Sequence, residues 1–269
     1  MRSYDFEYDG FMLSDFGYVI CSFGRADKKN VSNGSEINFT LSGIQHGAKH
    51  ELLESNYKNC LETTIQICKN ECDGCGDGME ITPDEVRELS QWLSRKGFHT
   101  FRLDKKEYED LYFEGSFDRI ERIMIGDSVY GLQLHFVSNR PFALRNPIDY
   151  YLKYLTANMT KIIEDESEEE GYIYPDIVEI IIEDDGDFVL YNDAEERTTS
   201  IANCSAGEII TLQYPMISTS DDNHKIQNDF NWIFPRIANT YANNKNALTA
   251  SLPCTIRFSY SPVAKIGLI

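Results

Sequence analysis

The chain has 269 residues and a formal net charge of −19 at pH 7, from 25 basic and 44 acidic side chains. A folded chain of this length buries roughly three quarters of its unfolded surface, so its core requires neither a metal nor a disulfide. No cluster of Lys and Arg offers a face for phosphates, which argues against tight binding of nucleic acid or of an anionic membrane surface.

The N-terminal segment MRSYDFEYDGF lacks the apolar core of a secretory signal. No apolar run approaches the roughly 20 residues that a membrane helix needs. We therefore expect synthesis in a cytoplasm, where thiols stay reduced, and no membrane span.

Apolar and polar residues alternate along many short segments. The alternating apolar residues are Tyr4, Phe6 and Tyr8; Ile37, Phe39 and Leu41; Leu132, Leu134 and Phe136; Val178, Ile180 and Ile182; and Ile256, Phe258 and Tyr260. This period of two predicts a mainly β protein with antiparallel sheets, each burying one face. The segment IIIEDDGDFVLYN is typical of a hairpin that turns at Asp185 and Gly186.

A helix is predicted over about 82–96, in ITPDEVRELSQWLSRKG. Thr82 is a plausible N-cap, Pro83 suits the first helical position, and Glu85 completes a capping box with Thr82. Gly97 can take the left-handed conformation that ends a helix. The residues expected to form its buried apolar stripe are Val86, Leu89, Trp92 and Leu93.

Cysteines gather in and before the segment CKNECDGCGDG, residues 68–78. A four-thiolate zinc site needs two close pairs, but only Cys72 and Cys75 have that spacing. Cys60 and Cys68 flank a segment that would span roughly 26 Å as a strand, too far for one ion without a bend. We predict a loop with ordinary thiols and no structural metal.

The sequence predicts no catalytic, cofactor-binding or metal-binding residue. The histidines are scattered, and His135 lies on the strand face opposite Leu134 and Phe136, as expected for a solvated or hydrogen-bonded side chain. No nucleophile elbow, zinc-protease helix or phosphate-binding glycine loop appears. The acidic run Glu164–Glu170 is expected to be a solvated loop. We place a domain boundary near Pro141.

The order of several segments resembles the distal tail (Dit) proteins of long-tailed, siphovirus-type bacteriophages or prophages. The segments that carry the resemblance are YDFEYDGFMLSDFGYVI, TIQICKNEC, ITPDEVRELSQWLSRKGFHTFRL, VYGLQLHFVSNRPFAL and the C-terminal NDFNWIFPRIANTYANNKNALTASLPCTIRFSYSPVAKIGLI. They are dispersed over nearly the whole chain, and none is a catalytic signature.

The resemblance implies two domains. An N-terminal ring-forming tail domain would span 1–140, and a C-terminal galectin-like β-sandwich would span 141–254. The segment 255–269 is a candidate to return to the first domain. For the ring interface we select the strand region Tyr4–Phe16 and the region Glu36–Leu41, since both combine apolar alternation with strand edges.

The resemblance also implies a structural role in the virion tail rather than an enzyme, without a cofactor. A homo-hexameric baseplate hub would join the major tail tube protein to the tail-associated tip protein and to receptor-binding parts. DNA would pass through the ring without tight binding, because an acidic lumen does not hold phosphates.

A competing interpretation is a carbohydrate-binding β-sandwich module or a glycoside hydrolase. Its basis is the fold class of the second domain together with several Tyr residues and Trp232, expected to be exposed. A module of this kind would be monomeric and bind glycans, whereas a hub would form a ring.

Overall fold

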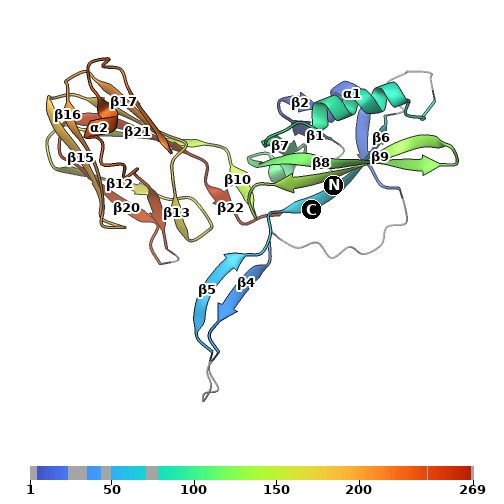
Figure 1. Cartoon of the computed structure of the whole chain (residues 1–269), viewed down its shortest axis with the longest axis horizontal. Helices are drawn as coiled ribbons and strands as arrows, with labels where there is room; N and C mark the ends of the chain where they lie inside the picture. The colour runs from blue at the N-terminus through green and yellow to red at the C-terminus, as the bar shows by residue number, and fades with distance from the viewer. Residues whose placement is uncertain (1–4, 24–34, 44–49, 71–77, 241, 268–269) are drawn as a thin grey trace. The chain divides into compact units, whose positions relative to one another are not determined.

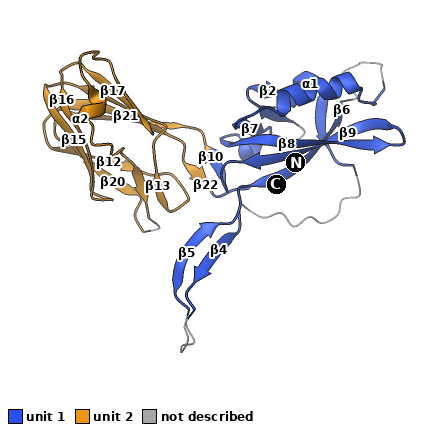
Figure 2. Cartoon of the chain, in the orientation of Figure 1, with its two compact units in different colours: residues 1–144, 265–269 blue, residues 145–264 orange. Residues whose placement is uncertain are grey.

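The computed structural model describes residues 5–23, 35–43, 50–70, 78–240 and 242–267. The chain divides into two compact units. Unit 1 comprises Met1–Leu144 and Lys265–Ile269, and unit 2 comprises Arg145–Ala264 (Figure 2). Among the described residues, no helix is long and apolar enough to cross a membrane.

Unit 1 is built on an antiparallel sheet with the strand order β2-β1-β7-β8-β9-β6-β3, and β10 pairs with β8 (Figure 1). Two short 3-10 helices lie at Leu13–Phe16 and Lys106–Tyr108. The other elements are β1 (Phe6–Tyr8), β2 (Phe11–Met12), β3 (Tyr18–Cys21), β4 (Ile37–Leu41), β5 (Leu52–Tyr57), β6 (Glu62–Lys69), α1 (Pro83–Leu93), β7 (His99–Leu103), β8 (Leu111–Ile125), β9 (Ser128–Ser138) and β10 (Ala143–Arg145).

The predicted helix is confirmed as α1, and it ends three residues earlier than expected. Thr82 Oγ1 accepts a hydrogen bond from Glu85 N, and a Glu85 carboxylate oxygen accepts from Thr82 N at 2.7 Å. Ser94 is the C-cap, and Arg95 lies beyond the helix, where its Nε donates to Trp92 O. The predicted stripe is buried as a set, consisting of Val86, Leu89, Trp92 and Leu93.

Trp92 joins the helix to the sheet. Its indole stacks on Phe16 with ring centroids 4.3 Å apart and on Phe6 at 6.0 Å. Its Nε1 donates to Tyr8 O at 3.1 Å, so the polar edge of the ring is satisfied although the residue is buried. The ring of Phe6 in turn contacts Phe117 at 5.7 Å, within the aromatic core of the sheet.

Unit 2 is a β-sandwich. A five-stranded sheet has the order β11-β21-β14-β17-β18, and a four-stranded sheet has the order β12-β20-β15-β16. Both sheets contribute to one core of buried apolar side chains. The elements are β11 (Ile148–Tyr154), β12 (Met159–Glu164), β13 (Gly171–Ile173), β14 (Ile177–Ile182), β15 (Gly186–Asn192), β16 (Arg197–Cys204), β17 (Ile209–Gln213), β18 (Met216–Thr219), α2 (Ile226–Asp229), β19 (Ile237–Asn239), β20 (Lys245–Ala250), β21 (Cys254–Tyr260) and β22 (Val263–Ala264).

The predicted hairpin at Asp185 and Gly186 is wrong. Both strands form, but β14 pairs with β17 and β21, whereas β15 pairs with β16 and β20. The turn therefore carries the chain from one sheet to the other. The cause is burial, because Ile180 and Ile182 on β14 and Phe188 on β15 all point into the core between the sheets.

The return to unit 1 begins at Lys265, ten residues later than the candidate segment 255–269. The strand β21 stays in unit 2, where it pairs with β11 and β14 and buries Ile256 and Phe258 completely. Within unit 1, Ala143 N donates to Ile266 O at 3.1 Å, and the hydroxyl of Tyr108 donates to Gly267 O.

We predict that Trp92→Ala destabilises the protein by about 3–5 kcal/mol, because it leaves a cavity between α1 and the sheet. Phe98→Ala, at a residue 60% exposed, is the matched control and should change stability by about 0.5 kcal/mol or less. Urea denaturation of both variants measures the difference. Equal stabilities would refute the role given to Trp92.

Candidate functional site

Unit 1 carries a hairpin that we call the apolar hairpin, formed by β4 and β5, which make a two-stranded sheet of their own. Ile37 lies opposite Tyr57, Leu41 lies opposite Leu52, and Phe39 lies between them. Because residues opposite each other in an antiparallel pair share a face, these side chains form one apolar face. Both strands also keep a free edge within the described residues.

The polar residues of the hairpin lie on its other face, with Asn38 opposite Asn56 and Thr40 opposite Glu54. The large apolar residues of the hairpin are each between 51% and 65% exposed: Ile37, Phe39, Leu41, Leu52 and Leu53. The expected burial of the Ile37, Phe39 and Leu41 face is therefore wrong within the described chain. The alternation is real, but among the described residues only Tyr57, whose ring meets that of Phe142 at 5.1 Å, packs on the rest of unit 1, while the Ile37, Phe39 and Leu41 side chains stay exposed.

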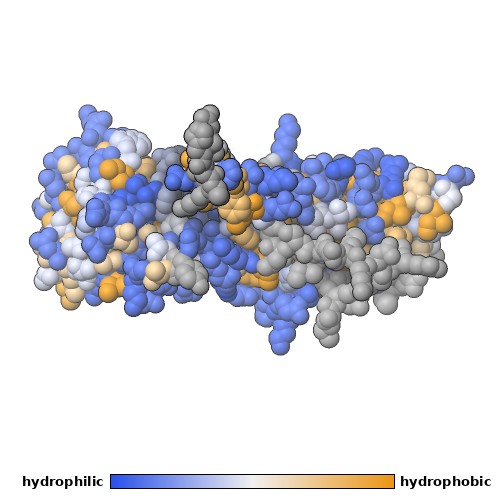
Figure 3. Space-filling view, turned by 90° about the horizontal axis from the view of Figure 1, so that it is seen from below, coloured by the Kyte–Doolittle hydropathy of each residue, from blue (hydrophilic) through white to orange (hydrophobic). Residues whose placement is uncertain are grey.

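A second hairpin of unit 1 also presents apolar residues. The strands β8 and β9 continue beyond the sheet to a turn at Gly126 and Asp127, next to which Met124 and Ile125 are 54% and 60% exposed. This hairpin was not predicted from the sequence. The signal was a Gly-Asp pair between two alternating runs, which is typical of a hairpin turn. Figure 3 shows hydrophobic surface, in orange, in several separate areas.

The N-terminal candidate region Tyr4–Phe16 offers less than expected. Tyr4 lies outside the described residues, and Phe6 and Tyr8 are completely buried. The strand β1 pairs with β2 on one side and β7 on the other, so it has no free edge. What remains accessible is the short strand β2, in which Phe11 is 53% exposed.

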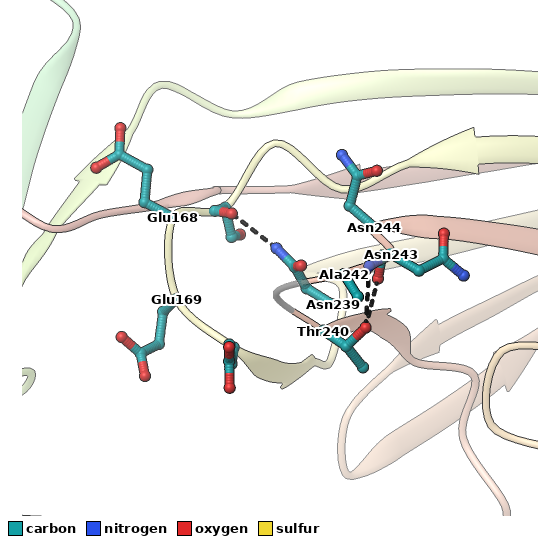
Figure 4. A pocket seen from close by; sticks show the side chains of 9 residues that line it. Glu168, Glu169, Asn239, Thr240, Ala242, Asn243 and Asn244 are labelled. Carbon is teal, nitrogen blue, oxygen red and sulfur yellow. Dashed lines mark hydrogen bonds between the residues drawn. The ribbon is translucent and has the colours of Figure 1, made fainter.

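A polar pocket of about 360 Å³ lies in unit 2 (Figure 4). Its lining residues are Ser167, Glu168, Glu169, Glu170, Asn239, Thr240, Ala242, Asn243 and Asn244. Asn239 Nδ2 donates to Ser167 O, and Thr240 Oγ1 donates to Asn243 O. Apart from Ala242, these side chains carry carboxylate, amide or hydroxyl groups, with no aromatic ring and no cation, which suits water better than an organic ligand.

The acidic run Glu164–Glu170 is not a simple solvated loop. Asp165 and Ser167 are buried, and Asp165 Oδ1 accepts hydrogen bonds from both the amide and the hydroxyl of Ser167. The hydroxyl of Tyr260 accepts from Glu166 N. Glu168 and Glu170 remain exposed, so the run alternates as a sheet edge does.

Unit 2 brings together a buried polar cluster that sequence spacing did not reveal. His224 Nδ1 lies 2.6 Å from Glu208 Oε1, and His224 Nε2 lies 3.3 Å from Asp229 Oδ2. Glu208 also accepts hydrogen bonds from Ser205 N and from the hydroxyl of Thr219. The His224 and Glu208 side chains are 3% and 1% exposed, so no substrate reaches them. The cluster anchors the segment around α2 to the sandwich.

The remaining residues considered for chemistry lie apart. His135 is hydrogen-bonded to Asp118, with Nδ1 and Oδ1 2.6 Å apart. Cys72 and Cys75 lie outside the described residues. In the described ranges, no group of three or more His, Cys, Asp or Glu is placed to hold a metal ion. Burial raises the pKa of both Cys204 and Cys254 to about 12, which keeps these thiols protonated and unreactive.

Two family models match the chain. One, described as the phage tail protein N-terminal domain, matches residues 1–140, and the other, described as the phage tail C-terminal domain, matches residues 142–260. No curated protein matches.

Solved structures share the fold. The SPP1 Dit (gp 19.1) protein, described as a paradigm of the hub adsorption apparatus in phages that infect Gram-positive hosts, aligns with a TM-score of 0.67 at 12% identity. The alignment covers 97% of this chain and 99% of that one. A chain of the phage P2 baseplate in its activated conformation aligns with a TM-score of 0.50 at 7% identity, covering 97% and 98%.

We predict that Glu208→Ala lowers the free energy of unfolding by about 3–5 kcal/mol, since it leaves His224 buried without its main partner. Asp118→Ala is the matched control, because it removes a carboxylate that pairs with His135 but is half exposed. It should lower the free energy of unfolding by about 1 kcal/mol or less. Chemical denaturation of both variants measures this. A Glu208→Ala variant no less stable than Asp118→Ala would contradict the anchoring role.

Proposed function

We propose that this chain, which belongs to the phage tail protein family whose models match both of its halves, is the structural hub of a tail tip. The matches confirm the resemblance noted from the dispersed sequence segments, and the shared fold with the SPP1 Dit protein agrees with it. The hub is a ring of six copies at the end of the tail tube. It joins the major tail tube protein to the tail-associated tip protein, and it carries receptor-binding parts.

The observation that carries the proposal is the uncovered face of the apolar hairpin. An isolated two-stranded hairpin is marginally stable in water, and burial of an apolar face requires further contacts. Five large apolar side chains more than half exposed on one hairpin mark an interaction surface in a chain of charge −19. A neighbouring copy supplies the cover, since strand addition at a free edge is available to it.

The geometry of such a contact favours a ring. In a ring, the hairpin of one copy packs on a different surface of the next copy, and such a head-to-tail contact closes when its rotation permits. The hairpin tip at Met124 and Ile125 provides a second apolar contact from the same unit. Unit 1 therefore supplies the interface, and unit 2 stays available for other partners.

The proposal includes a structural rather than an enzymatic role in the virion tail. In support, both matching family models are described as phage tail protein domains, and the buried His224 and Glu208 pair serves to anchor the segment around α2. DNA passes through the ring, and the acidic charge of the chain disfavours a lasting grip on its phosphates.

We expect ring formation to increase with protein concentration and with ionic strength. Copies of a chain that carries −19 repel one another, and salt screens this repulsion with a Debye length of about 10 Å at 0.1 M. Native mass spectrometry and sedimentation across both variables, alone and with the tail tube protein, measure the assembly. A chain that remains monomeric in every condition, including with the tube protein, contradicts the hub.

A substitution tests the interface itself. Phe39→Asp places a carboxylate in the apolar face and should abolish rings, whereas Thr40→Asp places the same charge on the polar face of the same strand and should preserve them. Both residues are exposed in the monomer, so both variants should fold as the parent does. Equal assembly of the two variants would exclude the apolar face as the interface.

A further inference from the structure

Unit 2 carries a connected set of aromatic side chains, which we call the aromatic ribbon: Tyr172, Tyr174, Tyr214, Trp232 and Phe234. Tyr174 and Tyr214 stack with ring centroids 4.3 Å apart and planes inclined by 15°. Tyr214 meets Phe234 at 5.3 Å, Phe234 meets Trp232 at 6.5 Å, and Tyr172 meets Tyr174 at 6.1 Å. The rings come from three separate segments of the chain, around residues 172–174, 214 and 232–234, so the fold assembles them.

The ribbon is accessible. Tyr172, Tyr214 and Trp232 are 57%, 56% and 54% exposed, and Tyr174 is partly exposed. Phe234 is itself buried, at 5% exposure, and the buried ring of Phe230 lies 5.6 Å from Trp232 and 5.0 Å from Phe234, so these two rings support the exposed ones. Large aromatic rings held side by side at the surface are costly to leave in water, and a site built from aromatic rings with a few polar groups is typical of a ligand platform.

Trp232 is fixed in an unusual backbone conformation. Its φ is 58°, in the left-handed region that bulky residues rarely adopt. The neighbours hold it there, because Asn231 N donates to Ser200 O and Ile233 O accepts from Thr199 Oγ1, both on β16. The indole Nε1 donates to Gln227 O. Backbone strain of this kind is common at binding sites. The indole is already held in place, so a ligand that stacks on it costs little additional side-chain entropy.

At the Tyr172 end of the ribbon lies Arg236, which forms an ion pair with Glu195. The guanidinium of Arg236 lies 3.5 Å from the ring centre of Tyr172 and forms two hydrogen bonds with Glu195, at 2.7 and 3.1 Å. The pair is mutually neutralised, and its side chains are 17% and 13% exposed. It supplies polar atoms beside the rings without adding net charge.

The charge of unit 2 restricts the ligand. The unit contains 20 acidic and 8 basic residues, so it repels phosphate, uronate and nucleic-acid ligands. The apolar C–H faces of pyranose rings pack on aromatic rings, and their hydroxyls bond polar groups at the edges. We propose that the aromatic ribbon binds a neutral oligosaccharide, with Trp232 and Tyr214 as the stacking rings. This site is independent of the ring interface, which lies in unit 1.

The experiment measures binding of maltoheptaose and of the hexamer of N-acetylglucosamine to the full chain by isothermal titration calorimetry. Trp92→Phe leaves Trp232 as the sole tryptophan, so the fluorescence of this variant should shift on binding of the same oligosaccharide. Trp232→Gly removes the indole and puts glycine, which readily adopts a positive φ, at this position. The variant should keep the melting temperature of the parent, and its affinity for the oligosaccharide should fall roughly tenfold or more. Tyr214→Ala should weaken it similarly.

Tyr151→Ala is the matched control, since Tyr151 is a tyrosine of unit 2 that is 68% exposed and lies outside the ribbon. It should leave the affinity unchanged. Three results overturn the proposal: no binding of either oligosaccharide, binding unaffected by Trp232→Gly, or a fluorescence shift of Trp232 on mixing with the tail tube or tip protein without sugar. The last result would identify the ribbon as a protein interface. None of these results bears on ring formation.

Discussion

A strand with alternating side chains has one apolar face, and that face must be covered for the strand to be stable in water. This requirement explains most of the chain. In unit 1, α1 covers the sheet through Trp92, whose indole packs on Phe6 and Phe16. In unit 2, the two sheets cover each other. The apolar hairpin leaves five large apolar side chains exposed within the described chain, and the proposed assembly would supply their cover.

The local parts of the fold were predictable because they depend on neighbours in sequence. Thr82 and Glu85 form their capping box three residues apart, and the Trp92 stripe follows helical spacing. The pairing partners were not predictable in the same way. The run through Asp185 and Gly186 has the composition of a hairpin, yet its strands enter different sheets, since that choice depends on partners such as Cys254–Tyr260, far along the chain.

The candidate surfaces show the same limit. Alternation at Ile37, Phe39 and Leu41 identifies an apolar face but does not say whether its cover lies within the chain. The left-handed conformation of Trp232 leaves no mark in the sequence, because Asn231 and Ile233 impose it through bonds to a strand about 30 residues earlier. The His224 and Glu208 pair is likewise created by packing. The identity and spacing of residues thus predicted local features such as an apolar strand face. Which faces are covered, and which side chains meet, depended on tertiary contacts between distant segments.

The negative charge is divided unevenly between the two units, and this suits the units to different kinds of contact. Unit 2 has 20 acidic and 8 basic residues, a net charge of −12, whereas unit 1 has 24 acidic and 17 basic residues, a net charge of −7. Most of the excess negative charge therefore lies in unit 2. Unit 1 can then bring copies together with less repulsion than the whole chain suggests. A strongly acidic unit 2 resists association with like copies and with anionic polymers, and this leaves neutral ligands and apolar stacking as its means of contact. The paired Arg236 and Glu195 beside Tyr172 fit this division, because they provide hydrogen-bonding groups while the surface there stays electrically neutral.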